Sequence, residues 1–545
     1  MRYFSFLFLI VLTSISFSQQ SKSPKLVVGI VIDQMCYDYL YRFQSKFSSG
    51  GFNKLMSQGV NCRNTHYNYV PTYTGPGHAS IYTGTTPMNH KIVANDWFNR
   101  KGNSFINCVG DSMVKGLGTN SKESKSSPKN MEALTITDQL RMTYKQSKVI
   151  SLSIKNRSAV LPGGHLSNGS YWFDTESGMF VSSSYYMKEL PSWVQAFNSS
   201  NSVTNYMQNP WKTLLPINEY IESDQDDSPY EQLVFGKKSP TFPYDFQSIK
   251  LGKEMNKAFI STPYANTHLL NFALDAIKNE ELGKDQYSDF LCLSFSSTDI
   301  LGHAFGPTSV EVEDMYLRLD LEMAKLIEEL EKQIGSDNFV MFVTADHAVV
   351  PVPQSLVDRK LPGGYIFLDE LMKSLKAELV TKFGADLISS YYNNNIYLNR
   401  ALIQSKGIDQ EKVEQCIVSS MINWEHIHSI VTSRAITQHK FFNYWEGLLV
   451  AGYDYERSGD ILFSFDAGYL TKEHKGENAH KGTSHGTGFS YDTHVPLLWY
   501  GGGLKQQEVF RKIEITDIAA TLTHILNLSK QSLTIGEPIL EIFKP

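Results

Sequence analysis

The stretch Leu26-Val27-Val28-Gly29-Ile30-Val31-Ile32 decides the fold, and Asp33 follows it directly. A run without a single polar side chain predicts a strand buried on both faces, because a strand with one wet face would alternate. Such strands are typical of a parallel sheet covered by helices. Four further runs of this kind recur along the chain, at Val149–Ile154, Phe290–Phe295, Phe339–Thr344 and Val495–Tyr500.

Helical patterns lie between these strands. The clearest runs from Val310 to Ile334, where apolar residues recur every three or four positions with Glu and Lys opposite. A second runs from Glu514 to Leu528. This alternation predicts an α/β fold with a mostly parallel central sheet and helices on both faces.

Two stretches break the alternation. Residues 161–263 are rich in Ser, Asn, Tyr, Trp and Pro, and residues 351–481 mix short elements with polar loops. We interpret both as insertions that decorate one catalytic domain spanning residues 24–545. Because large insertions can shield a face of the domain, we expect a monomer.

The N-terminus predicts export. Met1-Arg2 is positively charged, the apolar run Phe4–Ile15 follows, and Ser16-Phe17-Ser18 places small residues at the cleavage-determining positions. This is the pattern of a secretory signal peptide, here residues 1–18, and its apolar run is too short to span a membrane comfortably. We therefore expect a periplasmic or secreted protein that does not bind the membrane after signal cleavage.

The composition narrows the function. The chain has 545 residues, 41% hydrophobic and 19% charged, as in ordinary globular proteins. Its net charge of −6 argues against a nucleic-acid binder, which needs a basic surface. The five cysteines include no CxxC pair, so no thiolate zinc site is implied. Export would permit a disulfide, with Cys62 and Cys108 as the candidate pair.

Acidic residues and histidines collect where strands end. In open α/β sheets, ligands bind beyond the carboxyl ends of the strands. Each residue alone is more often a turn or surface residue, but the joint pattern of oxygen and imidazole ligands suits a catalytic zinc site. The set comprises three Asp and three His: Asp33, Asp299, His303, Asp346, His347 and His485.

Thr74 is the candidate nucleophile. It stands two residues before Pro76, which is well placed in the first turn of a helix. Taken alone, Thr74 is best interpreted as the residue that caps this helix. The same position at the positive end of a helix also favours an anion, such as an alkoxide or a phosphate.

The chain resembles the alkaline phosphatase superfamily, and within it the bacterial phosphate-irrepressible (PafA-type) alkaline phosphatases. The Gly75-Pro76-Gly77 stretch departs from the family pattern and leaves the start of the helix open. The resemblance rests on motifs in family order over nearly the whole mature chain: Val27–Met35, Val70–His78 with Ile81–Gly84, Asn95–Trp97, Ile154–Arg157, Ser297–His303, Thr344–His347 and Thr483–Thr487.

This resemblance implies a phosphatase with two Zn²⁺ ions and a covalent phosphothreonine intermediate on Thr74. It implies one zinc bound by Asp299, His303 and His485. It implies a second zinc bound by Asp33, Asp346 and His347, with Thr74 completing the shell. Asn95, Lys155 and Arg157 would bind the phosphoryl oxygens of the substrate.

Lys155 and Arg157 favour phosphate monoesters as substrates. A monoester dianion carries more charge on its non-bridging oxygens than a diester does, so two cations beside two zinc ions would select it. The nearest alternative is a phosphodiesterase or nucleotide pyrophosphatase of the same superfamily, which shares the threonine and both zinc sites. A sulfatase would need a Cys or Ser nucleophile, a phosphoglycerate mutase would use Ser and manganese, and an inactive binding protein should have lost a metal ligand.

Overall fold

Ten strands form the central sheet of the protein, in the order β20-β2-β19-β11-β1-β10-β7-β8-β9-β6. The computed structural model describes residues 23–200, 203–438, 443–472 and 480–543, so the predicted signal peptide lies outside the described residues. The five neighbouring central strands run parallel. They are β11 (Phe339–Thr344), β1 (Leu26–Ile32), β10 (Asp289–Phe295), β7 (Val149–Ser153) and β8 (Gly169–Asp174).

The outer strands make the sheet mixed. On one side, β19 (Leu497–Gly501) runs antiparallel to β11 and to β2 (Val60–Cys62), which pairs with β20 (Gln507–Val509). On the other, β9 (Met179–Ser183) runs antiparallel to β8, and β6 (Gly116–Leu117) closes the edge. The mostly parallel α/β sheet expected from the sequence is confirmed.

The predicted run Val495–Tyr500 is two elements rather than one parallel strand. Pro496 lacks an N–H and interrupts it, so β18 (His494–Val495) joins a small sheet with β3 (Thr65–His66) and β21 (Ile513–Glu514). The rest becomes the antiparallel β19. Similarly, the predicted helix Glu514–Leu528 is shorter, because Glu514 belongs to β21 and α20 spans Asp517–Ile525.

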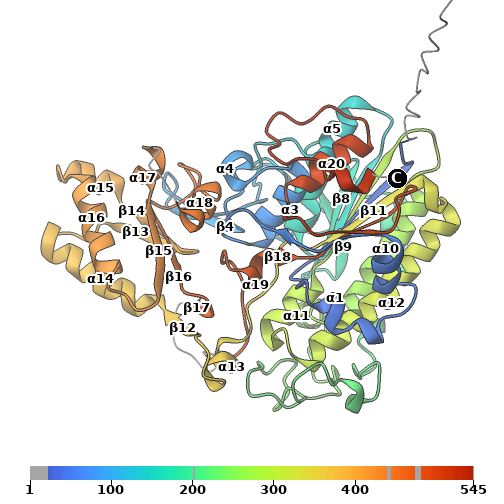
Figure 1. Cartoon of the computed structure of the whole chain (residues 1–545), viewed down its shortest axis with the longest axis horizontal. Helices are drawn as coiled ribbons and strands as arrows, with labels where there is room; N and C mark the ends of the chain where they lie inside the picture. The colour runs from blue at the N-terminus through green and yellow to red at the C-terminus, as the bar shows by residue number, and fades with distance from the viewer. Residues whose placement is uncertain (1–22, 201–202, 439–442, 473–479, 544–545) are drawn as a thin grey trace, which may run out of the picture.

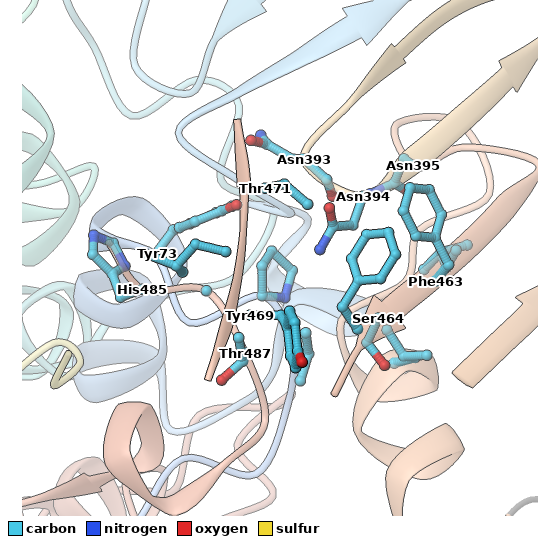
Figure 2. Close-up of a pocket in the computed structure, with 17 residues that line it drawn as sticks. Tyr73, Asn393, Asn394, Asn395, Phe463, Ser464, Tyr469, Thr471, His485 and Thr487 are labelled. Atoms are coloured by element: carbon cyan, nitrogen blue, oxygen red, sulfur yellow. Dashed lines mark hydrogen bonds between the residues drawn. The ribbon is translucent and has the colours of Figure 1, made fainter. Parts of the chain in front are cut away.

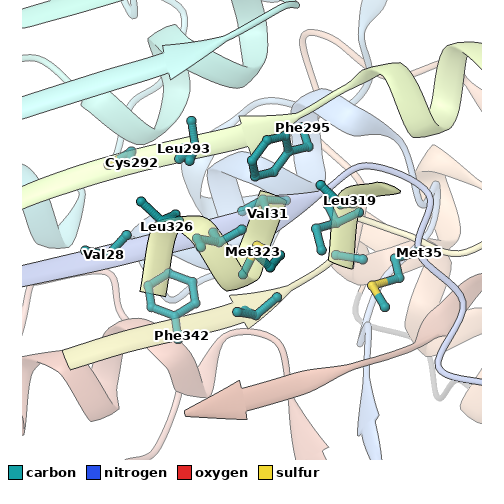
Figure 3. Packing of buried hydrophobic residues seen from close by; sticks show 14 of the residues in the cluster. Val28, Val31, Met35, Cys292, Leu293, Phe295, Leu319, Met323, Leu326 and Phe342 are labelled. Atoms are coloured by element: carbon teal, nitrogen blue, oxygen red, sulfur yellow. The ribbon is translucent and has the colours of Figure 1, made fainter. Parts of the chain in front are cut away.

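Helices cover both faces of the sheet. Figure 1 shows α3 (Thr74–Thr83), α5 (Ile136–Thr143) and α20 on one side, and α10 (Pro263–Asn279), α11 (Ser297–Phe305) and α12 (Val310–Gln333) on the other. The apolar stripe predicted for α12 is buried: Leu319, Met323 and Leu326 share the main hydrophobic core with Val28 and Val31 of β1 (Figure 3).

The described residues between 364 and 472 form two smaller sheets and a hydrophobic core of their own, here called the inserted unit (Figure 1). Strands β13 (Ile388–Tyr392), β14 (Asn395–Leu398), β16 (Ile461–Phe465) and β15 (Ile427–Thr432) make a four-stranded sheet in this order. Helices α14 (Leu368–Phe383), α15 (Arg400–Ser405) and α16 (Gln410–Met421) accompany it, and β12 (Gly364–Phe367) pairs with β17 (Tyr469–Lys472).

The other stretch interpreted as an insertion begins inside the sheet. Strands β8 and β9 both fall within residues 161–263, so the start of this stretch extends the sheet and only the remainder decorates it. All five cysteines are free and buried, so the Cys62–Cys108 pairing expected from export is wrong. Cys62 lies in β2, between β19 and β20 of the central sheet, whereas Cys108 packs near Gly75 at the start of α3. Among the described residues, no helix combines the length and apolarity needed to cross a membrane.

Candidate active site

Three aspartates follow three neighbouring strands. Asp33 directly follows β1, Asp346 comes two residues after β11, and Asp299 lies in the first turn of α11 after β10. Because β1 pairs in parallel with both β10 and β11, the three carboxyl ends lie at one edge of the sheet. All three carboxylates are buried there.

Asp33, Asp346 and His347 form one ligand group, with their ligand atoms within 4.8 Å of one another. His347 Nε2 lies 3.4 Å from Asp33 Oδ1 and 3.7 Å from Asp346 Oδ2. These three atoms are buried and lack a hydrogen-bond partner among the described residues. Because unpartnered buried polar atoms are costly, their convergence fits a bound cation.

Asp299, His303 and His485 lie beside this group. Asp299 Oδ1 is 3.2 Å from His303 Nε2 and 3.5 Å from His485 Nε2. The atoms that fall within 4.8 Å of one another belong to Asp299, His347 and His485, and the His347 and His485 rings stack with centroids 3.4 Å apart. His347 therefore lies between the two groups, and His303, whose side chain is 38% exposed, borders them.

The three imidazoles make the same kind of contact through Nδ1. Each ring places Nδ1 within hydrogen-bond distance of a backbone carbonyl, of Ala348 for His347, Thr483 for His303 and Thr72 for His485. A donor Nδ1–H fixes the tautomer in which Nε2 carries a lone pair. All three Nε2 atoms therefore present a lone pair to the aspartates, as metal ligands do.

Lys155 supplies part of the counter-charge. Its Nζ lies 2.7 Å from Asp33 Oδ2 and 2.5 Å from Asp299 Oδ2, so it bridges the two ligand groups. Burial raises the pKa of Asp33 well above its ordinary value, and the carboxylates of Asp299 and Asp346 raise it further. One ammonium does not balance three buried carboxylates, so the oxygen and imidazole donors fit two divalent cations such as zinc.

Helix α3 begins at Thr74, with Tyr73 rather than Thr74 as its cap. This settles the helix start that the Gly75-Pro76-Gly77 stretch left open. A Cβ on Gly77 would lie 2.4 Å from the carbonyl oxygen of Asp346, so the first turn of α3 lies directly against that ligand. Thr74 thus stands at the positive end of the helix, beside the aspartate cluster.

His78 also connects α3 to the cluster. Its Nδ1 lies 2.9 Å from the carbonyl oxygen of Thr74 and 3.3 Å from Asp346 Oδ2. Its Nε2 lies 2.8 Å from the hydroxyl of Ser294 in β10. This fully buried imidazole therefore fixes the distance between Thr74 and the ligand groups.

Asn95 and Arg157 complete the predicted phosphoryl site. Asn95 Oδ1 accepts a 2.7 Å hydrogen bond from the backbone N–H of Gly75, which leaves the NH₂ end of its amide for other partners. Arg157 Nε is buried and has no hydrogen-bond partner among the described residues. A buried donor of this kind fits a site whose anion comes from the substrate.

The structure adds Gln34 and Asp492, which the sequence did not single out. Gln34 has a left-handed backbone (φ 64°), donates Nε2–H to Asp299 Oδ1 at 2.7 Å, and donates its backbone N–H to Asp346 Oδ1 at 3.2 Å. It thereby joins the two ligand groups. Asp492 Oδ2 accepts from the backbone N–H groups of Gly486 and Thr487 and holds the loop of His485. No sequence signal marks either residue, because a Gln or Asp in a loop is ordinary.

Comparisons with known proteins agree with this geometry. A family profile described as type I phosphodiesterase / nucleotide pyrophosphatase matches residues 27–488. The chain is 39% identical over 523 residues to alkaline phosphatase PafA of Elizabethkingia meningoseptica, covering 95% of this chain and 94% of the relative. It is 38% identical over 529 residues to alkaline phosphatase PhoV of Synechococcus elongatus, covering 97% and 94%. A Myroides odoratus relative named calcium-transporting ATPase is 39% identical over 529 residues, covering 96% and 95%.

Solved structures extend the similarity to three dimensions. The crystal structure of wild-type PafA superimposes with a TM-score of 0.90 at 38% identity, covering 96% of this chain and 99% of that one. A structure of a PafA variant also superimposes with a TM-score of 0.90, at 37% identity, covering 95% of this chain and 99% of that one. In this variant one threonine is changed to serine, and one asparagine, one lysine and one arginine are changed to alanine. The chain thus belongs to the alkaline phosphatase superfamily, as a phosphomonoesterase of the PafA and PhoV type.

Proposed function

We propose that this chain is an exported alkaline phosphatase that holds two zinc ions and hydrolyses phosphate monoesters through a phosphorylated Thr74. The observation that carries the proposal is the convergence of Asp33, Asp346 and His347, whose facing atoms are buried and unpartnered, beside the first turn of α3. Export rests on the signal-peptide pattern of residues 1–18 alone.

The ligand groups divide naturally between two metals. Asp33, Asp346 and His347 would hold one zinc ion, and Asp299, His303 and His485 the other. Bound zinc acts as a Lewis acid and lowers the pKa of an oxygen that it coordinates. Gln34 would hold the two sites together, because it donates one hydrogen bond to a carboxylate of each group.

Thr74 accounts for the chemical step. Its deprotonated oxygen forms a bond to phosphorus while the bond to the ester oxygen breaks, and the departing oxygen takes up a proton to become the alcohol. Water then attacks the phosphothreonine, so that inorganic phosphate leaves and the Thr74 hydroxyl is restored. Thr74 lies at the N-terminus of α3, beside the backbone N–H groups of the first turn. This position stabilises both the alkoxide and the phosphoryl group.

Asn95, Lys155 and Arg157 would bind the non-bridging oxygens. Asn95 is held by Gly75, next to the nucleophile, and offers its NH₂ group. Arg157 offers a guanidinium whose buried Nε has no partner among the described residues. The PafA variant changes one threonine, one asparagine, one lysine and one arginine, the same residue types in the same chain order as Thr74, Asn95, Lys155 and Arg157.

Replacing Thr74 tests the proposal. We expect Thr74→Ala to lower phosphate release from 4-nitrophenyl phosphate by about 10³-fold or more, as loss of a nucleophile does. Metal analysis should still find two zinc ions per chain. In acid-quenched wild-type protein, mass spectrometry should find phosphate on the peptide that contains Thr74.

The matched control is Thr83→Ala, the same substitution at the other end of α3. Thr83 is equally buried, and among the described residues its hydroxyl bonds within the helix, to the carbonyl oxygen of Ala79. Thr83→Ala should therefore keep the wild-type rate. Turnover by Thr74→Ala at a substantial fraction of wild type would rule out this nucleophile, and one zinc or none per chain would rule out the two-metal site.

A further inference from the structure

A cleft of about 640 Å³ opens from the candidate active site toward the inserted unit. Tyr73, the residue before Thr74, and His485 line its inner end. The opposite wall comes from the inserted unit and includes Asn393 and Thr471. Figure 2 shows the adjoining inner pocket, with Tyr73 and His485 on one side and Asn393, Asn394 and Thr471 on the other. An ester whose phosphorus lies at Thr74 would therefore extend its organic group into this cleft.

The outer cleft is lined by aromatic rings. Phe105 lies on β5 (Ser104–Asn107), which pairs with β4 (Asp96–Asn99) in a hairpin of the catalytic domain. Its side chain is 53% exposed, and its ring meets that of Tyr392 in the inserted unit edge-on, with centroids 5.0 Å apart. At the inner end, the Tyr73 ring lies edge-on to His485 at 5.6 Å. Such rings offer apolar faces to a flat ligand.

The two walls are held together. Asn393 Nδ2 donates a 3.2 Å hydrogen bond to the backbone carbonyl of Asp96 in β4. Asn393 and Asn394 form the turn between β13 and β14 with φ of 50° and 56°, a left-handed conformation that Asn tolerates well. The hairpin tip is therefore a fixed wall, and Phe105 and Tyr392 keep their spacing.

The charge of the cleft disfavours a second anion. Asp96 and Asp369 line it with two carboxylates, against one ammonium from Lys472. Positive charge for the phosphate lies at the inner end, where Lys155 and Arg157 are predicted to bind. The organic group that best matches the outer cleft therefore carries no negative charge.

We propose that this cleft binds the alcohol portion of phosphate monoesters and selects those whose alcohol carries a flat ring without negative charge. This rests on the proposed function, because the ester must be cleaved at Thr74 for its alcohol to lie here. Phe105 is the main specificity-determining residue, since it is the exposed ring of the outer cleft.

The test compares two primary alkyl esters, 2-naphthylmethyl phosphate and ethyl phosphate, whose similar leaving groups isolate the effect of the ring. We expect the wild type to cleave the naphthylmethyl ester with the higher kcat/KM. Phe105→Ala should lower kcat/KM for this ester by about 3- to 10-fold, the size of an aromatic contact, and leave ethyl phosphate within about twofold. Phe105→Trp should retain or increase the preference for the ring.

Phe510→Ala is the control, because Phe510 is another exposed phenylalanine, 66% exposed, that does not line the cleft. Phe510→Ala should leave kcat/KM unchanged for both esters. Equal kcat/KM for both esters in the wild type, or no selective loss in Phe105→Ala, would overturn the proposal while leaving the phosphatase function intact. Failure of the wild type to cleave either ester would instead refute the proposed function.

Discussion

If the proposed function holds, replacing Arg157 tests the preference for monoesters over diesters more cleanly than replacing Lys155. Lys155 is paired with Asp33 and Asp299, so its removal would also disturb the ligand groups. Arg157 Nε has no hydrogen-bond partner among the described residues, so replacing Arg157 breaks no hydrogen bond of that atom. We expect Arg157→Ala to lower kcat/KM for 4-nitrophenyl phosphate by about 10- to 100-fold, the value of a charge-assisted hydrogen bond.

The comparison substrate is the methyl diester of 4-nitrophenyl phosphate, because it has one charged oxygen fewer than the monoester. Its kcat/KM should change by less than about threefold in Arg157→Ala. Arg157→Lys keeps the charge but loses the planar fork, and should give an intermediate monoester rate. Equal losses for the two substrates would contradict a role of Arg157 in selecting monoesters.

At the scale of single residues, the sequence predicts the clustering of Asp and His side chains better than it predicts the groups that surround them. Asp33 and Asp346 follow buried strands, and parallel strands place their ends together, so chain order alone implied the cluster. Gln34 was missed because its role depends on a left-handed backbone that brings its amide to Asp299. The partnering of Lys155 with two aspartates was also unpredictable, since it follows from the local balance of charge.

Among the helices, α3 depends on a glycine for its approach to the active site. A Cβ on Gly77 would lie 2.4 Å from the Asp346 carbonyl oxygen and 2.8 Å from its Cβ. The added methyl must push the first turn of α3 away from that ligand. We expect Gly77→Ala to lower kcat/KM by about 10²-fold, as an ångström-scale misplacement of a nucleophile does. Thermal unfolding should show a lower Tm.

Gly447→Ala is the matched control, because Gly447 lies inside the helix α18 (Tyr444–Ala451) and a Cβ there would meet nothing within 4 Å. This variant should keep full activity and gain up to about 1 kcal/mol of stability from the better helix propensity of Ala. If Gly77→Ala had the activity and Tm of the wild type, close packing of α3 against Asp346 would not be needed for activity or stability.

Elements with uniform patterns were predicted within a residue or two. The runs at β1 and β11 and the stripe of α12 are decided by burial, which the sequence records directly. The run Val495–Tyr500 was wrong as one parallel strand because its direction depends on how the chain returns to the sheet. Apolar character alone does not carry that information.

At the scale of the whole molecule, the described residues form more than one hydrophobic core, whereas the sequence implied a single one. The inserted unit has a core of its own around Met372, Leu379 and Ile417, although its shorter elements looked like decoration. Conversely, β8 and β9 belong to the central sheet although the surrounding composition is that of a loop-rich insertion. Strand pairing over long distances decided both cases, and no local pattern reports it.

Buried acids give the whole molecule a dependence of stability on pH. Glu311 and Glu231 are both buried, and each has a carboxylate oxygen without a hydrogen-bond partner among the described residues. Burial raises the pKa of Glu311 to about 8 and that of Glu231 to about 11, the latter also through the charge of Glu311. The folded chain therefore holds protons that the unfolded chain has already released.

The sign of this effect follows from the pKa shift of Glu311, from 4.5 to about 8. Between these values the folded state binds more protons, so the free energy of unfolding falls as pH rises, by up to about 1.4 kcal/mol per pH unit. Glu311→Gln has no proton to lose and still accepts the hydrogen bond from Tyr244. Urea unfolding across this pH range should therefore give a shallower slope for Glu311→Gln than for wild type. Glu328→Gln is the control, because Glu328 lies on the exposed face of α12, and this variant should follow the wild-type slope. If Glu311→Gln had the same slope as wild type, Glu311 would be ionised in the folded protein.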